Sequence, residues 1–253
     1  MPETPTTVDG LRAIELSFRP LRDIASGRSV CYLARTQLNT PGLGTLMPET
    51  FRPAAEASGK SQELFSLELL QLAEAISALN QSDKLYHWVS QELPLSLLRE
   101  RTTVASLESI CEQFSLTPNT FCLAVPEETL EEKDDRAANN IARLRRHGFH
   151  VMLTGFGESG CPFIRLSELL VDYVMLCPSI TLSLGKSERS DLAVHSIINF
   201  INELQSEPVA DGVKNSTQAE ALYSFGCNFC AGSLSGEYIP LSELVGSESQ
   251  IIY

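Results

Sequence analysis

The stretch AIELSFRPLRDIASGRSVCYLAR, residues 13–35, holds two apolar runs separated by a short turn. The runs Ala13–Phe18 and Ser29–Arg35 are each as short as a typical strand, and Asp23–Gly27 lies between them. A connection of this length cannot contain the helical crossover that two parallel neighbours need. The stretch therefore predicts an antiparallel pair of strands at the start of the fold.

Downstream, strand-like and helix-like patterns alternate, which is typical of parallel strands joined by helical crossovers. Strands are predicted over Leu85–Ser90, Thr120–Val125, Phe149–Leu153, Val171–Cys177, Val209–Gly212 and Phe229–Gly232, and helices over Gln62–Ala78, Leu107–Phe114, Glu128–His147, Ser187–Leu204 and Thr217–Phe225. This number of strands over about 240 residues favours a closed barrel over an open sheet. We predict an α/β fold, a modified TIM-type (β/α)8 barrel with one antiparallel strand. Residues 1–10 are expected to form a loose tail and residues 11–253 a single domain.

Composition limits the class of protein. The 253 residues carry a net charge of −13, with 43% hydrophobic and 20% charged residues, which is typical of a soluble globular chain. Such an anionic protein disfavours direct binding to nucleic acid or to anionic lipid. No apolar stretch is long enough to span a bilayer, and no secretory signal is recognised at the N-terminus. The 7 cysteines then indicate reduced thiols and a cytoplasmic location.

A set of short motifs carries a family resemblance. In chain order these are Phe18-Arg19-Pro20-Leu21, the segment with Pro48, Phe51, Pro53, Ala55 and Glu56, then His147-Gly148-Phe149, Gly155-Phe156-Gly157, Val171-Asp172-Tyr173, Asp211-Gly212-Val213, Phe225-Gly226-Cys227 and Ala231-Gly232. Together, over about residues 11–245, they resemble the EAL domain family. The resemblance implies a barrel with one antiparallel strand. Active members of that family are phosphodiesterases that linearise cyclic di-GMP with two divalent metals.

Carried over residue by residue, the family's pocket is heavily substituted here. The glutamate of the family's name falls on Cys31 in the triplet Cys31-Tyr32-Leu33, and the metal-binding asparagine falls on Trp88. The predicted vestigial pocket, in which positions are either substituted or retained, consists of Arg19, Cys31, Leu33, Arg35, Trp88, Ala124, Glu127, Thr154, Gly155, Met175, Asp211 and Ala231. Ala, Trp and Met side chains cannot bind Mg²⁺, which prefers oxygen ligands. We expect no catalytic residue, no metal site and no cofactor.

The resemblance therefore implies a regulator that works by binding another protein, with transcription regulators of motility, adhesion or biofilm among the partners. A homodimer is left open. The alternative is a metal-independent cyclic di-GMP receptor, in which Arg19 and Arg35 bind phosphates and Trp88 or Phe156 stacks on a guanine. An enzyme of another chemistry is disfavoured because no nucleophile and base are assembled by any local signature.

Two further motifs have structural interpretations. Cys227-Asn228-Phe229-Cys230 lacks a second ligand pair and enters a predicted strand, so we interpret both thiols as core residues. The acidic run over residues 127–135 is expected to open a helix, where negative charge is stabilising. An acidic docking face for a basic partner is the alternative interpretation of that run.

Overall fold

The computed structural model describes residues 7–8, 11–82, 84–160 and 162–246. Within these residues a barrel is closed by the strands β3 (Ile14–Asp23), β4 (Ser29–Thr40), β6 (Trp88–Glu92), β7 (Phe121–Pro126), β8 (His150–Phe156), β9 (Tyr173–Leu176), β10 (Glu207–Ala210) and β11 (Phe229–Cys230). β3 is antiparallel to both of its barrel neighbours, β4 and β11, and every other neighbouring pair in the barrel is parallel. The predicted barrel with one reversed strand is confirmed.

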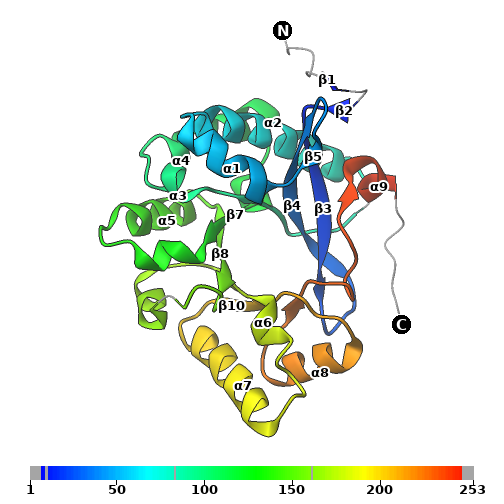
Figure 1. Ribbon diagram of the computed structural model, residues 1–253, viewed down its shortest axis with the longest axis vertical. Coiled ribbons are helices and arrows are strands. Elements are labelled where there is room, and N and C mark those ends of the chain that lie inside the picture. Colours follow the sequence, from blue (N-terminus) through cyan, green and yellow to red (C-terminus); the bar gives the residue numbers. More distant parts are fainter. Residues whose placement is uncertain (1–6, 9–10, 83, 161, 247–253) are drawn as a thin grey trace.

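Helices surround the strands (Figure 1). They are α1 (Pro48–Ala57), α2 (Ser61–Asn80), α3 (Leu95–Leu98), α4 (Thr103–Phe114), α5 (Arg136–Arg146), α6 (Pro178–Thr181), α7 (Glu188–Glu203), α8 (Ser216–Ser224) and α9 (Leu241–Gly246), with 3-10 turns η1 (Pro118–Thr120), η2 (Glu127–Glu131) and η3 (Phe163–Glu168). Four short strands complete the structure: β1 (Thr7–Val8), β2 (Leu11–Arg12), β5 (Gly44–Leu46) and β12 (Ile239–Pro240). No described helix combines the length and the apolar content that crossing a bilayer requires.

Alternation along the strands creates two separate apolar clusters. In β4, Cys31 and Leu33 belong to a cluster inside the barrel, whereas Tyr32 and Ala34 pack in the layer between strands and helices. Successive side chains of a strand point to opposite faces, so one strand serves both layers. The interior cluster consists of Leu21, Cys31, Leu33, Trp88, Cys122, Ala124, Met152, Met175, Val209 and Ala231. The barrel is therefore filled with side chains up to its mouth.

The start of α7 shows why the periodic pattern there gives a helix. Ser187 accepts a hydrogen bond on Oγ from Ser190 N at 3.1 Å, and Ser190 Oγ accepts one from Ser187 N at 3.0 Å. These reciprocal bonds satisfy two backbone donors that a helix end otherwise leaves unpaired. The helix predicted over Ser187–Leu204 is therefore present as α7, with Ser187 as its N-cap.

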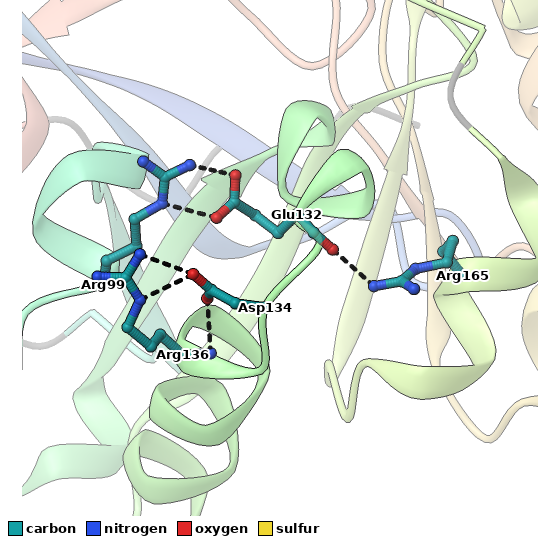
Figure 2. Close-up of polar contacts among 5 residues, drawn as sticks. All are labelled: Arg99, Glu132, Asp134, Arg136 and Arg165. Atoms are coloured by element: carbon teal, nitrogen blue, oxygen red, sulfur yellow. Dashed lines mark hydrogen bonds and ion pairs between the residues drawn. The ribbon is translucent and has the colours of Figure 1, made fainter.

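The acidic segment differs from the prediction of one helix over Glu128–His147. Its first part is the 3-10 helix η2, residues 132–135 form a connector, and α5 begins only at Arg136. Figure 2 shows the reason: the Glu132 carboxylate accepts two hydrogen bonds from Arg99, and its carbonyl oxygen accepts one from Arg165 Nη2 at 2.7 Å. These tertiary contacts hold the connector outside a helical path.

The bounds of other elements also differ from those predicted from the sequence. β6 begins at Trp88 instead of Leu85, whose side chain is 86% exposed before the strand starts. α1 was not predicted, because two prolines lie within its ten residues. The loose tail expected over residues 1–10 lies outside the described residues apart from Thr7–Val8, and it stays a prediction.

Candidate functional site

A pocket of about 230 Å³ lies at the C-terminal ends of the parallel strands, where barrel proteins of this type place their active sites. It is lined by Arg19, Leu33, Ala34, Arg35, Thr36, Pro48, Glu49, Arg52, Ser90, Gln91, Glu92, Ala124, Met152, Thr154, Met175, Asp211 and Tyr238. These residues come from strands β3, β4, β6, β7, β8 and β9, from α1, and from the segments that follow β10 and precede β12. We call this space the mouth pocket.

Two arginines and a tyrosine form one side of the mouth pocket. Arg19 Nη2 lies 2.7 Å from Asp211 Oδ1, and both side chains are largely buried. The guanidinium carbon of Arg35 lies 3.7 Å from the ring centroid of Tyr238, which is a cation–π contact. Burial raises the pKa of Tyr238 even though Arg19 and Arg35 act against it, so the phenol stays protonated at neutral pH. This side can present positive charge and hydrogen-bond donors to an anion.

An ion network centred on Arg52 also borders the mouth pocket. Arg52 contacts Glu68 Oε1 at 2.9 Å with Nη2 and Glu92 Oε2 at 3.2 Å with Nε. Glu68, which is fully buried in α2, also accepts a hydrogen bond from Thr36 Oγ1 at 2.5 Å. Burial raises the pKa of Glu68, and the Arg52 charge opposes that rise. The Glu68 and Glu92 carboxylates are thus paired with a cation beside the pocket.

The floor of the mouth pocket is apolar. Leu33, Ala124 and Met175 line it and also belong to the interior cluster. Trp88 lies beneath them, fully buried, with its ring centroid 5.1 Å from that of Tyr173. Burial raises the pKa of Cys31 to about 12, so this thiol is neutral. Among the described residues, no three His, Cys, Asp or Glu side chains converge in a way that could hold a metal ion.

Glu127 lies apart from the mouth pocket, beneath the loop that follows β8. Its carboxylate accepts hydrogen bonds from the backbone nitrogens of Gly157 at 2.7 Å, Glu158 at 3.1 Å and Ser159 at 2.8 Å, and from Ser159 Oγ at 2.6 Å. Burial alone would raise the pKa of Glu127, but these bonds to the ionised form outweigh burial and lower it. Glu127 therefore anchors the loop, and Gly155 at φ +75° lets the chain turn into it.

The structure brings together most of the side chains predicted for the vestigial pocket. Arg19, Leu33, Arg35, Ala124, Thr154, Met175 and Asp211 line the mouth pocket. Cys31, Trp88 and Ala231 lie below it in the interior cluster. Glu127, at the start of η2, holds the loop that follows β8, and Gly155 lies near the end of β8. The described cysteines are all buried and form no disulfide: Cys31, Cys111, Cys122, Cys177, Cys227 and Cys230. This agrees with the core interpretation of the Cys227–Cys230 motif.

Sequence reasoning missed Tyr238 and Arg52. Tyr238 comes from the last part of the chain, just before β12 pairs with β3, and no local motif marks it. The expectation that Trp88 or Phe156 offers a stacking face is wrong, because both rings are fully buried. The aromatic ring at the mouth pocket is instead that of Tyr238.

Comparison with known proteins identifies the class of the fold. The family model for the EAL domain matches residues 10–238, so the chain belongs to the EAL domain family. It resembles the cyclic di-GMP phosphodiesterase NbdA of Pseudomonas aeruginosa, with 25% identity over 231 residues, 91% of this chain and 30% of the relative. The cyclic di-GMP phosphodiesterase PdeB of Shewanella oneidensis is 25% identical over 228 residues, 90% of this chain and 26% of the relative. The chain thus spans less than a third of either relative.

Solved structures share the fold. The PaMucR phosphodiesterase in complex with c-di-GMP aligns with a TM-score of 0.82 and 22% identity over 92% of this chain and 94% of that one. The FimX EAL domain from Pseudomonas aeruginosa bound to c-di-GMP aligns with a TM-score of 0.77 and 17% identity over 89% of this chain and 90% of that one. At these identities, both comparisons show that the overall fold is shared.

Proposed function

We propose that this chain is a catalytically inactive EAL domain that regulates by contact with another protein, within the cyclic di-GMP-linked control of motility, adhesion or biofilm. The observation that carries the proposal is the apolar interior at and beneath the floor of the mouth pocket. There Cys31, Trp88 and Ala124 stand where the family resemblance places oxygen ligands of a metal-dependent phosphodiesterase. We further propose that the domain works in the cytoplasm, where thiols stay reduced.

The donor chemistry of the mouth pocket supports inactivity. Two neighbouring divalent cations need several carboxylate or amide oxygens to offset their dehydration and mutual repulsion. Here the Asp211 carboxylate is paired with Arg19 and the Glu92 carboxylate with Arg52. Each of those guanidiniums is a positive charge beside the place a cation would occupy. The pocket residues do not fit a two-metal centre, and we derive no hydrolytic step through one.

The test is hydrolysis of cyclic di-GMP by the purified chain in the presence of Mg²⁺ or Mn²⁺. We expect no linear dinucleotide, while an active phosphodiesterase of the family assayed in parallel releases it. We also expect no change in melting temperature on addition of EDTA, since no structural ion is required. Turnover that rises with enzyme concentration and disappears with EDTA would overturn the proposal.

A second candidate function is a metal-independent cyclic di-GMP receptor. Arg35, stacked on Tyr238 at 3.7 Å, favours it because the pair presents a positive charge and a phenol at the mouth pocket. A guanidinium is well suited to a phosphate, and an aromatic ring to a purine. The c-di-GMP complexes of the two structural neighbours are consistent with this candidate, although their identity to this chain is low.

Calorimetry with cyclic di-GMP in the absence of divalent cations separates the two candidates. Micromolar binding that Arg35→Ala abolishes would establish the receptor. The matched control is Arg28→Ala, because Arg28 is an exposed arginine in the turn of the β3–β4 hairpin, away from the pocket-lining residues. If the unmodified chain shows no heat of binding with cyclic di-GMP, the receptor candidate is rejected and the proposal of a protein-interaction function stands.

A further inference from the structure

A second pocket, of about 430 Å³, lies at the opposite end of the barrel from the mouth pocket. It is bordered by the C-terminal end of α5, by the start of β8 and by the segment that leads into β9. Its lining includes Arg145, Arg146, His150, Leu170 and Asp172. We call it the α5 pocket. It shares no lining residue with the mouth pocket.

The α5 pocket carries positive charge within a protein of net charge −13. Among its lining residues the sole carboxylate is Asp172, which lies 2.9 Å from Arg145 Nη2 and accepts a hydrogen bond from Val151 N at 2.9 Å on its other oxygen. Arg146 donates from Nε to the carbonyl of Ala142, at 3.3 Å, within its own helix. One guanidinium is therefore neutralised by Asp172, and the other is available to a partner's carboxylate.

An apolar surface adjoins these cations. The Leu170 side chain is 59% exposed at the edge of the pocket, and Phe149 and Ala142 line it nearby. Burial lowers the pKa of His150, so this imidazole is neutral near pH 7 and adds no repulsion toward a cation or attraction toward an anion. The pocket thus combines one uncompensated arginine with a leucine that buries apolar surface when a side chain covers it.

We propose that the α5 pocket binds an acidic segment of a partner protein, with a carboxylate paired to Arg146 and an adjacent apolar side chain packed on Leu170. This inference rests on the proposed function, since it assigns the surface through which protein contact occurs. Charge complementarity selects an acidic occupant. The net charge of −13 would repel such a partner at long range, but salt screens that repulsion beyond about 8 Å, whereas a contact inside the pocket is screened far less.

The experiment measures anisotropy of a short labelled peptide of alternating glutamate and leucine with the full chain. Arg146→Glu is the diagnostic variant. Within the described part of the chain, the polar contact of the Arg146 guanidinium is with the Ala142 carbonyl, so its replacement leaves no described carboxylate without its cation. We expect Arg146→Glu to weaken binding by about tenfold or more and Leu170→Ser to weaken it to a smaller degree. Arg189→Glu is the matched control, since Arg189 is exposed in the first turn of α7, and it should leave binding unchanged.

Three outcomes overturn the proposal: no binding of the peptide, equal binding to all variants, or equal binding of a lysine and leucine peptide. Sedimentation of the same proteins tests for a second copy as the occupant. If the unmodified chain sediments as a dimer and the Arg146→Glu variant as a monomer, the pocket binds another copy of this chain and the partner-protein assignment is wrong. Cyclic di-GMP turnover would overturn the proposed function without altering the peptide result, so the two failures can be told apart.

Discussion

Arg19 Nη2 and Asp211 Oδ1 lie 2.7 Å apart, which joins the reversed strand β3 to the residue that follows β10. The same Asp211 oxygen accepts a hydrogen bond from Gly212 N at 2.7 Å. Residues separated by 192 positions in sequence thus meet at the mouth pocket. As a result, the Asp211 carboxylate neutralises the Arg19 guanidinium, and the same oxygen also accepts the hydrogen bond from Gly212 N.

Replacement of that carboxylate should uncover the positive charge of Arg19. Asp211→Asn keeps an oxygen acceptor but removes the negative charge, so the affinity of the mouth pocket for inorganic pyrophosphate should rise by roughly fivefold, or about 1 kcal/mol. Calorimetry measures the change, with the exposed Asp135→Asn as the matched control. Equal affinities in the two variants would mean that Arg19 does not reach an anion in the pocket.

The anchor of the β8 loop gives a stability prediction. Glu127→Ala removes the acceptor for three backbone N–H groups and a hydroxyl, so the free energy of unfolding should fall by about 3 kcal/mol. Urea denaturation measures this loss. The neighbouring Glu128 is exposed, and Glu128→Ala should change stability by less than about 0.5 kcal/mol. Similar losses at both positions would contradict the anchoring role.

The same carboxylate predicts a pH dependence. The pKa of Glu127 is lowered in the folded protein from its ordinary value of 4.5, so its contribution to stability is fully present above pH 4.5 and is lost as the pH falls through the lowered value. The raised pKa of Glu68 has the opposite effect, because the folded protein then holds that proton more tightly. The stability difference between the unmodified chain and Glu127→Gln isolates the first effect. It should shrink below pH 4.5, and a constant difference would contradict the assignment.

The barrel could be predicted from the sequence because its signals are local. The hairpin turn Asp23–Gly27 enforces the antiparallel β3–β4 pair, and the alternation of strands and helices enforces parallel pairing elsewhere. Strand ends were less accurate. β10 covers Glu207–Ala210 instead of Val209–Gly212, because Pro208 hides the beginning of the strand in the sequence pattern.

The candidate site was only partly predictable, because its contacts join residues that are far apart in the sequence. Arg35 was recognised from its place after the Cys31-Tyr32-Leu33 triplet, but its partner Tyr238 is set by the pairing of β12 with β3. Glu127 was recognised as a position of the family's pocket, but its role as the acceptor for the loop of Gly157 comes only from the fold. Such contacts depend on tertiary geometry, which a single sequence does not encode in any local pattern.

Gly232 should be among the most sensitive positions of the chain. A Cβ atom there would lie 2.4 Å from the carbonyl oxygen of Val213 and 2.5 Å from its nitrogen, at a φ of +137° that side chains rarely adopt. Gly232→Ala should therefore destabilise the protein by about 3 kcal/mol. Gly42 also has a positive φ, +78°, but nothing lies within 4 Å of its added Cβ, so Gly42→Ala should cost only about 1 kcal/mol. Thermal melting of the two variants measures this difference, and equal losses would show that backbone strain alone decides both.

The ion network of Arg52 predicts an asymmetric pair of losses. Glu68 is fully buried, and its cationic partner is Arg52. Arg52 has a second carboxylate partner, Glu92, at 3.2 Å, so removal of Glu68 does not leave Arg52 without an anion. Arg52→Met should therefore cost about 3 kcal/mol, because it leaves a buried carboxylate without its cation, and Glu68→Leu should cost less. The double variant should recover most of the loss caused by Arg52→Met, since no buried charge remains.

Urea denaturation gives the free energy of unfolding of the unmodified chain, the two single variants and the double variant. The coupling energy between Arg52 and Glu68 follows from these four values. The exposed pair Lys60 and Glu63, 3.2 Å apart at the start of α2, is the matched control. Its double-variant cycle should give a coupling below about 0.5 kcal/mol, because both side chains are solvated. Additive losses at Arg52 and Glu68 would show that the two groups do not depend on each other. The network would then be a consequence of packing between α1 and α2, and would not be what fixes them beside the mouth pocket.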